Sequence, residues 1–175
     1  MGCIAACGIC KIESSMIYTD ELSMRTFELN IFIDRPRIEV YNHMAEPINM
    51  IGLQPFLTSL DVLKEQKDGN GIVLRPYYFV ETHRWLGLPI RRTRVYTVIH
   101  LTKPHSDLEF HVFRTSDTQI VYHYLFQESE EGRTHLTQKF RFEKVSRLLE
   151  NRVFEQANQT QRALLTNLKV RLEKS

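Results

Sequence analysis

The C-terminal segment 144–175, KVSRLLENRVFEQANQTQRALLTNLKVRLEKS, contains neither glycine nor proline. Apolar or small side chains recur along it at steps of three and four residues, the spacing of one face of an α-helix. These positions are Val145, Leu149, Val153, Ala157, Thr160, Leu164, Leu168 and Leu172. The segment therefore predicts one long amphipathic helix, which needs a large apolar surface to cover.

The chain before this helix contains several short runs in which apolar and polar side chains alternate, as they do in half-buried strands. The connections between runs are short, so neighbouring strands should pair antiparallel. Asp-Gly and Asn-Gly steps at 68–71 favour a tight hairpin turn because these residues tolerate positive φ. The expected strands cover residues 25–34, 59–67, 72–84, 91–102, 108–114, 118–128 and 133–143.

Two short helices are expected between the first and second of these strands. Asp34 offers an N-cap and Pro36 suits a first helical turn. The apolar stripe of this first helix consists of Ile38, Val40, Tyr41 and Met44. Residues 47–57, which carry a compact apolar side, predict the second helix.

Length and composition predict one domain with a substantial core, since the chain has 175 residues and 42% of them are hydrophobic. The 23 basic and 21 acidic residues nearly balance at a net charge of +2, so we expect no nucleic-acid partner. Apolar runs stay far below the roughly 18 residues of a spanning helix. The three cysteines all lie within the first ten residues, which favours a reducing, cytoplasmic location for a soluble protein.

Residues 1–23 are expected to form a flexible N-terminal extension, because the first clear strand pattern begins just after Met24. Residues 24–175 then form the domain. The start Met1-Gly2-Cys3 is similar to that of doubly acylated proteins, although Ala6 stands where Ser or Thr is usual. Acylation of Gly2 and Cys3 and a true start at Met24 are both left open.

The order strand, two short helices, six strands and long helix resembles that of the START/Bet v 1-like superfamily. This superfamily is also called SRPBCC, or polyketide cyclase/dehydrase and lipid transport. The resemblance covers about residues 24–175 and rests on element order, on Asp34-Arg35-Pro36 before the first helix, and on the C-terminal segment without glycine or proline. It implies an α+β helix-grip fold, with a seven-stranded curved antiparallel sheet around the long helix and a cavity between them. Members bind lipids, sterols, polyketides or plant hormones, and a minority are enzymes.

Alternation along each strand predicts which side chains face the cavity. The inward sets are Leu74, Tyr78 and Val80; Val95, Thr97, Ile99 and Leu101; Leu108, Phe110 and Val112; Ile120, Tyr122, Tyr124 and Phe126; and Thr134, Leu136, Gln138, Phe140 and Phe142. Glu81 and His83 have the opposite parity to Tyr78, so they are expected outside unless their strand is bulged. A one-residue bulge would reverse any of these sets.

The expected ligand-binding residues combine apolar walls with a few hydrogen-bonding groups, as small-molecule sites do. They are Tyr78, Val80, Thr97, Ile99, Phe110, Tyr122, Tyr124, Leu136, Gln138, Phe140, Thr160 and Leu164. The alternative is that these side chains fill the core and leave no cavity.

The seven histidines form no metal-binding pair of the usual helical spacing, so we expect no metal, and the sequence predicts no cofactor. Alternation places four of them on the outer face of the sheet, where cross-strand neighbours can approach one another: His100, His111, His123 and His135.

The turn at residues 85–90, WLGLPI, is apolar where turns are usually polar, and arginines flank it at 84, 91, 92 and 94. We predict that Trp85, Leu86 and Leu88 stand at the cavity entrance. Transient contact with an anionic membrane, packing in a dimer and packing on the protein's own helix are the alternatives.

The leading functional prediction is a carrier or sensor that binds a hydrophobic small molecule, lipid-like, polyketide or aromatic, without turnover. One alternative is a polyketide cyclase/aromatase-type enzyme in which Tyr78, Tyr122 or Tyr124 orients a ketone and helps to move an α-proton. Another is an interaction module that acts through the hairpin 84–94. The sequence assigns no catalytic residue, and it leaves open whether the chain is a monomer or a homodimer.

Overall fold

The computed structural model describes residues 13–15, 25–85 and 88–174. Its helices are α1 (Arg37–Ala45), the short 3₁₀ helix η1 (Pro47–Met50) and the long α2 (Arg147–Glu173). The strands are β1 (Glu13–Ser15), β2 (Phe27–Ile33), β3 (Leu57–Val62), β4 (Gln66–Lys67), β5 (Val73–Trp85), β6 (Leu88–Lys103), β7 (Asp107–Thr115), β8 (Thr118–Glu128) and β9 (Thr134–Lys144). The predicted element order is confirmed.

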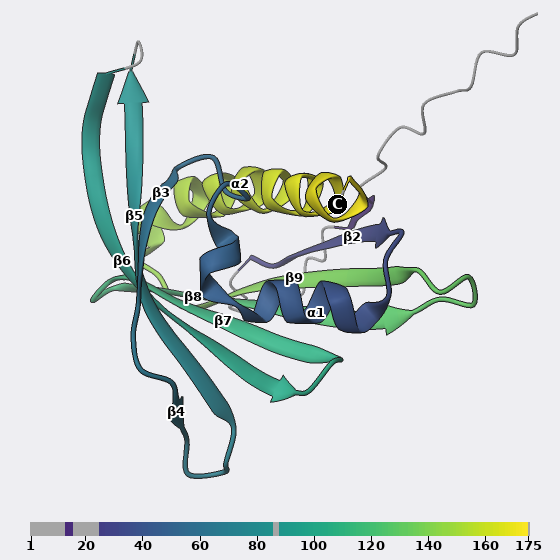
Figure 1. Cartoon of the computed structure of the whole chain (residues 1–175). Coiled ribbons are helices and arrows are strands. Elements are labelled where there is room, and N and C mark those ends of the chain that lie inside the picture. The colour runs from purple at the N-terminus through teal and green to yellow at the C-terminus, as the bar shows by residue number, and fades with distance from the viewer. Residues whose placement is uncertain (1–12, 16–24, 86–87, 175) are drawn as a thin grey trace, which may run out of the picture.

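The described strands form one antiparallel sheet in the order β1-β2-β9-β8-β7-β6-β5-β3, with β4 also paired to β5. The sheet curves around α2, and β5 and β6 form its long hairpin (Figure 1). This is the predicted α+β helix-grip fold. The expected strand 59–67 is divided into β3 and β4, and β1, which the sequence did not predict, pairs with β2 from Glu13↔Asn30 to Ser15↔Glu28.

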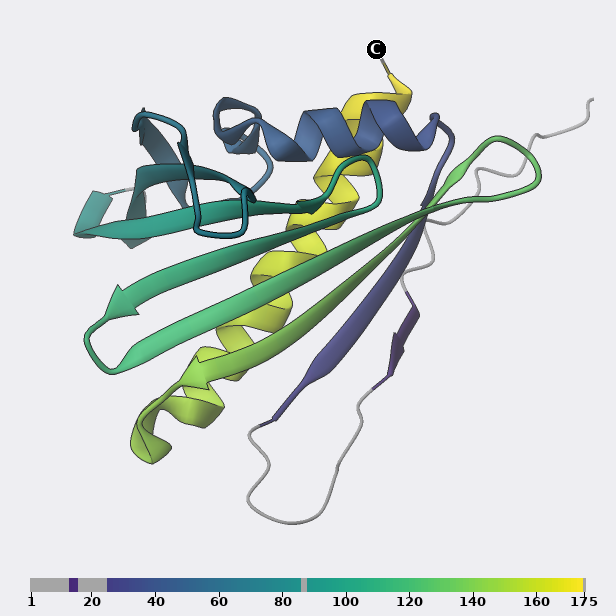
Figure 2. The same ribbon diagram turned by 90° about the horizontal axis from the view of Figure 1, so that it is seen from below.

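The N-cap predicted at Asp34 is wrong, because α1 starts later and Pro36 occupies that position. The Asp34 backbone N–H donates instead to Glu173 Oε1 at 2.8 Å, and Arg35 Nε donates to the Leu172 carbonyl at 2.6 Å. The entry into α1 is thereby attached to the C-terminal end of α2, which lies beside α1 (Figure 2). The second predicted helix is only the single turn η1.

The α2 face that meets the sheet is shifted slightly from the predicted stripe. Its buried side chains are Phe154, Ala157, Gln161, Leu164, Leu165, Leu168 and Leu172. Leu149 remains 45% exposed, whereas Phe154 packs edge-on against Phe27 and Phe140. The prediction of a long amphipathic helix is confirmed, and Gln161 is a polar residue at its buried face that the spacing did not single out.

The inward sets predicted for β6, β7, β8 and β9 are confirmed, since all are buried except Leu101, which is partly buried against the core. The set predicted for β5 is wrong. Tyr77 pairs with Thr97 and Phe79 with Val95, so Tyr77, Phe79 and Glu81 face inward. Leu74, Tyr78 and Val80 therefore lie on the outer face.

A bulge explains the reversed parity of β5. The hairpin begins with Trp85↔Leu88 and Arg84↔Pro89, and its register shifts between His83 and Arg84, so that His83 pairs with Arg91. Without this shift the register would continue to Tyr78↔Val95, which is the parity that the sequence predicted. One extra residue on one strand turns every following side chain to the other face.

Candidate ligand-binding site

The interior between the sheet and α2 holds a cavity lined by β5, β7, β8 and α2. Its walls contain Gln54, Tyr77, Phe79, Glu81, Phe110, Val112, Arg114, Tyr122, Tyr124, Gln156, Ala157, Thr160, Gln161 and Leu164. The volume is only about 30 Å³, far below the roughly 300–1,000 Å³ of typical small-molecule sites. A larger molecule must therefore displace side chains that fill this space in the structure.

Five of the predicted ligand-binding residues line this cavity: Phe110, Tyr122, Tyr124, Thr160 and Leu164. Another five are buried in the adjacent core without lining it: Thr97, Ile99, Leu136, Gln138 and Phe140. Tyr78 and Val80 lie on the opposite face of the sheet, where Arg94 stacks over the Tyr78 ring at 4.0 Å. The sequence missed Tyr77, Phe79, Glu81 and Arg114. The first three were missed because the register shift between His83 and Arg84 reverses the faces of β5.

Buried tyrosines supply most of the hydroxyl groups on the cavity wall. The Tyr124 hydroxyl donates to Gln161 Oε1 at 2.8 Å. Burial raises the pKa of Tyr122 to about 12, and the nearby Arg114 guanidinium partly offsets this effect. Burial also raises the pKa of Tyr77 and Tyr124 well above the usual value. All three phenols therefore stay protonated and can donate hydrogen bonds at neutral pH.

Glu81 and Arg114 form an ion pair on the cavity wall. This position of Glu81 is contrary to the expectation that its side chain lies outside. Glu81 is 5% exposed, and its carboxylate receives two hydrogen bonds from Arg114, Nη2–Oε2 at 2.5 Å and Nη1–Oε1 at 3.3 Å. Burying a charge is costly unless it is paired. The pair thus satisfies both groups while keeping a carboxylate within a largely apolar interior.

The side-chain amide of Gln138, in the core beside this cavity, lacks hydrogen-bond partners in the part of the chain that the structure describes. Its residue is fully buried on β9, and neither its amide nitrogen nor its amide oxygen has a hydrogen-bond partner among the described residues. An unpaired buried polar group costs roughly 1–3 kcal/mol. Such a group is expected where water or a ligand completes the hydrogen bonding.

The outer face carries the four histidines that alternation placed there. His100 stacks on His111 with ring centroids 3.9 Å apart, and His111 Nε2 lies 2.8 Å from Glu109 Oε2. His123 Nε2 is 2.6 Å from Asp107 Oδ1, while His135 stacks on Phe32. Within the described part of the chain, no three His, Cys, Asp or Glu side chains gather as a metal site.

The predicted entrance residues cannot be placed. Leu86 lies outside the described residues, and the described side chains do not include those of Trp85 and Leu88. Their role at the entrance remains a prediction. No helix in the described ranges is long and apolar enough to cross a membrane.

The chain has the helix-grip fold that is found in START/Bet v 1-like proteins. The structure is similar to the ZhuI aromatase/cyclase from Streptomyces sp. R1128, with a TM-score of 0.67, 12% identity, and coverage of 86% of this chain and 94% of that one. A START superfamily protein from Mycobacterium smegmatis gives a TM-score of 0.63 at 11% identity, over 85% of this chain and 97% of that one. For Ara h 8.0201 the TM-score is 0.64 at 10% identity, over 86% and 98%.

No protein-family model matches the sequence, and no curated protein matches it either. Because the identities to the solved structures are low, the likeness establishes the fold and leaves the activity to the site itself.

Proposed function

We propose that this chain binds a hydrophobic small molecule between the sheet and α2, and that it acts as a carrier or sensor. Phe79, Phe110 and Leu164 would contact the apolar body of the molecule. The protonated hydroxyl of Tyr122 would donate a hydrogen bond to an oxygen atom of the molecule. Apolar walls with a few convergent polar groups are the usual composition of small-molecule sites.

The unpaired amide of Gln138 is the observation that carries this proposal. A core that served only for packing would gain stability from an apolar residue at this position, since nothing described satisfies the amide. Tyr124 on β8 is the cross-strand partner of Gln138 on β9. A molecule that enters beside Tyr124 and carries a carbonyl or hydroxyl group would complete the hydrogen bonds of the Gln138 amide. The small cavity requires the interior to open as the molecule enters.

Native mass spectrometry of the purified full chain tests the proposal, followed by extraction of any bound compound. We expect a noncovalent adduct that is lost on denaturation. Thr160→Trp should abolish the adduct because Thr160 lines the cavity, whereas Gln159→Trp, on the exposed side of α2, should retain it. An adduct that survives equally in both variants would place the compound elsewhere and refute the proposal.

The second candidate is an enzyme of the cyclase/aromatase type, and the inward position of Glu81 favours it. Glu81 would accept an α-proton from a ketone that Tyr122 holds by its carbonyl oxygen. The ketone would have to contact the carboxylate despite its pairing with Arg114.

Turnover of the extracted compound separates the two candidates. An enzyme should convert the compound and lose at least a hundredfold in rate with Glu81→Gln, while still binding it. An unchanged compound after prolonged incubation would exclude turnover. The interaction module, with transient membrane contact or self-association through the hairpin 84–94, would instead bind vesicles or dimerise without any small-molecule adduct.

A further inference from the structure

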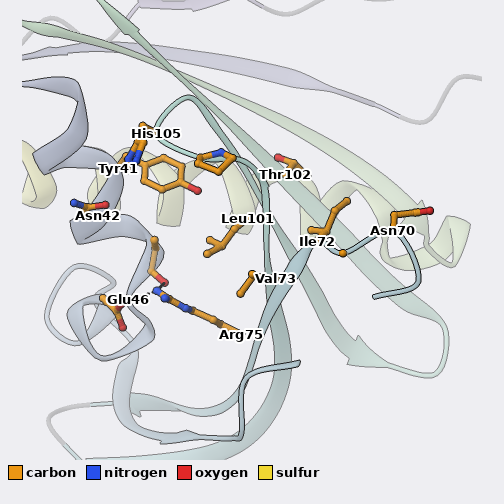
Figure 3. Close-up of a pocket in the computed structure, with 13 residues that line it drawn as sticks. Tyr41, Asn42, Glu46, Asn70, Ile72, Val73, Arg75, Leu101, Thr102 and His105 are labelled. Atoms are coloured by element: carbon orange, nitrogen blue, oxygen red, sulfur yellow. Dashed lines mark hydrogen bonds and ion pairs between the residues drawn. The ribbon is translucent and has the colours of Figure 1, made fainter. Parts of the chain in front are cut away.

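A second cavity, of about 710 Å³, lies outside the region that α2 covers. It is bounded by α1, the turn between β4 and β5, and the turn between β6 and β7 (Figure 3). We call it the α1 pocket. It is lined by Tyr41, Asn42, Ala45, Glu46, Asn70, Gly71, Ile72, Val73, Arg75, Leu101, Thr102, Pro104 and His105. Its volume falls within the range of about 300–1,000 Å³ that is typical of ligand sites.

The α1 pocket is separate from the interior cavity, with which it shares no lining residue. The two spaces adjoin along β5, whose alternate side chains face inward. Val73 and Arg75 line the α1 pocket, and Tyr77 and Phe79 line the interior. A molecule can therefore occupy the α1 pocket without any displacement of α2.

The floor of the α1 pocket is apolar. Ile72 from the β4–β5 turn, Val73 from the start of β5 and Leu101 from β6 line this part of the pocket (Figure 3). Ala45 on α1 and Pro104 in the β6–β7 turn add further apolar surface. A small apolar ring or short chain placed here would cover these side chains and gain from their removal from water.

Two hydrogen-bond donors of the pocket-lining residues are not fully used. The Tyr41 hydroxyl is buried near the backbone of His105, yet it makes no hydrogen bond of ordinary length and angle with the described residues. Burial raises the pKa of Tyr41, so the hydroxyl stays protonated. Arg75 donates through Nη1 to the Ala45 carbonyl at 3.0 Å and through Nε to Glu65, which leaves Nη2 without a hydrogen bond to the described residues.

The charges around Arg75 decide which kind of head group fits. Its guanidinium already contacts two carboxylates, Glu46 at 2.6 Å and Glu65 at 2.9 Å. Two negative charges against one positive charge disfavour an incoming anion. A neutral oxygen acceptor can take hydrogen bonds from Arg75 Nη2 and the Tyr41 hydroxyl without that repulsion.

We propose that the α1 pocket is a binding site for an uncharged small molecule with an apolar body and one hydroxyl or carbonyl oxygen. The body covers Ile72, Val73 and Leu101, and the oxygen receives hydrogen bonds from Tyr41 and Arg75. This site is independent of any ligand between the sheet and α2.

Titration of the full chain with 2-naphthol, followed by methyl and amide NMR, tests the proposal. We expect saturable shifts at Ala45, Ile72 and Leu101, and at least tenfold weaker binding of the matched anion 2-naphthoate. Tyr41→Phe should weaken 2-naphthol binding about three- to tenfold, the effect of one hydrogen bond. Its fold should persist, because the hydroxyl has no partner to lose.

Leu101→Trp should fill the floor and abolish binding, whereas Leu148→Trp, at a residue 94% exposed on α2, should leave it intact. The proposal is overturned if 2-naphthol shifts none of these signals, or if Tyr41→Phe binds it unchanged. Equal binding of 2-naphthoate would overturn the assigned ligand class. Shifts confined to Val112 and Leu164 would show entry into the interior instead, which bears on the proposed function and refutes the α1 pocket as the site.

Discussion

Gln138 shows how a single buried side chain connects stability with function. Sequence alternation placed it on the inner face of β9, and the structure confirms that position with no exposed surface. Alternation alone gave no means of knowing that its amide would lack partners. That property depends on side chains from β2, β8 and α2, which only the folded packing brings together.

Replacing Gln138 with Leu should stabilise the free protein and weaken ligand binding at the same time. The change removes an unpaired amide while keeping a similar volume, so we expect a gain of about 1–2 kcal/mol in the free energy of unfolding. Urea denaturation measures the gain, and adduct occupancy in native mass spectra measures the loss of binding. A destabilised variant would mean that the amide is satisfied in solution.

Glu109 on the outer face should make stability depend on acid. The hydrogen bond with His111, opposed by burial and aided by Arg141, lowers the pKa of Glu109 to about 2 in the folded protein. Because the ordinary value is 4.5, this contribution is fully present above about pH 4.5 and is lost as the pH falls through about 2.

Thermal unfolding between pH 2 and pH 7 checks this expectation with Glu109→Gln. The variant should have a lower melting temperature than the wild type at neutral pH, and the difference should shrink toward pH 2. Glu155→Gln, on the exposed side of α2, serves as the control and should follow the wild type. Parallel curves for Glu109→Gln and the wild type would contradict the assigned role of Glu109.

At the scale of elements, the sequence predicted which segments form helices and strands more reliably than it predicted their faces. The four strands from β6 to β9 alternate clearly, so their inner faces were predicted correctly. Strand β5 has apolar residues at both parities, for example Tyr77 and Tyr78, and alternation cannot choose between them. The register shift between His83 and Arg84 made the choice and brought Glu81 inside.

The attachment of α2 to η1 and to the loop after it depends on backbone carbonyl groups that no sequence pattern marks. Arg171 donates to the carbonyls of Asn49 and Ile51, both at 2.6 Å, and Asn167 donates to that of Leu53 at 2.9 Å. Gly52 lies within this contact at a φ of +79°, where a Cβ would approach Arg171 Nη2 to 2.9 Å.

Gly52→Ala should therefore destabilise the protein by about 1–2 kcal/mol, from the left-handed backbone conformation together with the displaced arginine. Chemical denaturation gives the value. Gly69→Ala is the matched control, since Gly69 has no neighbour within 4 Å of the added carbon and should be nearly neutral. Equal stability of the two variants would show that the loop after η1 adjusts freely.

At the scale of the whole molecule, element order was enough to predict the helix-grip fold. The size of the cavity was beyond the sequence, because it depends on how side chains from β5, β7, β8 and α2 fill their common space. The structure leaves about 30 Å³ beneath α2 and about 710 Å³ beside α1. The inner surface of the sheet thus borders a very small space beneath α2 and a much larger one beside α1.

The most direct test of ligand binding beneath α2 is a set of intermolecular NOEs between the compound identified by native mass spectrometry and the methyl groups of the protein. The account predicts contacts with Val112, Ala157 and Leu164, which line the interior cavity. Contacts only with Ile72 and Leu101 beside α1, or only with Val98 and Val121 on the outer face, would contradict it.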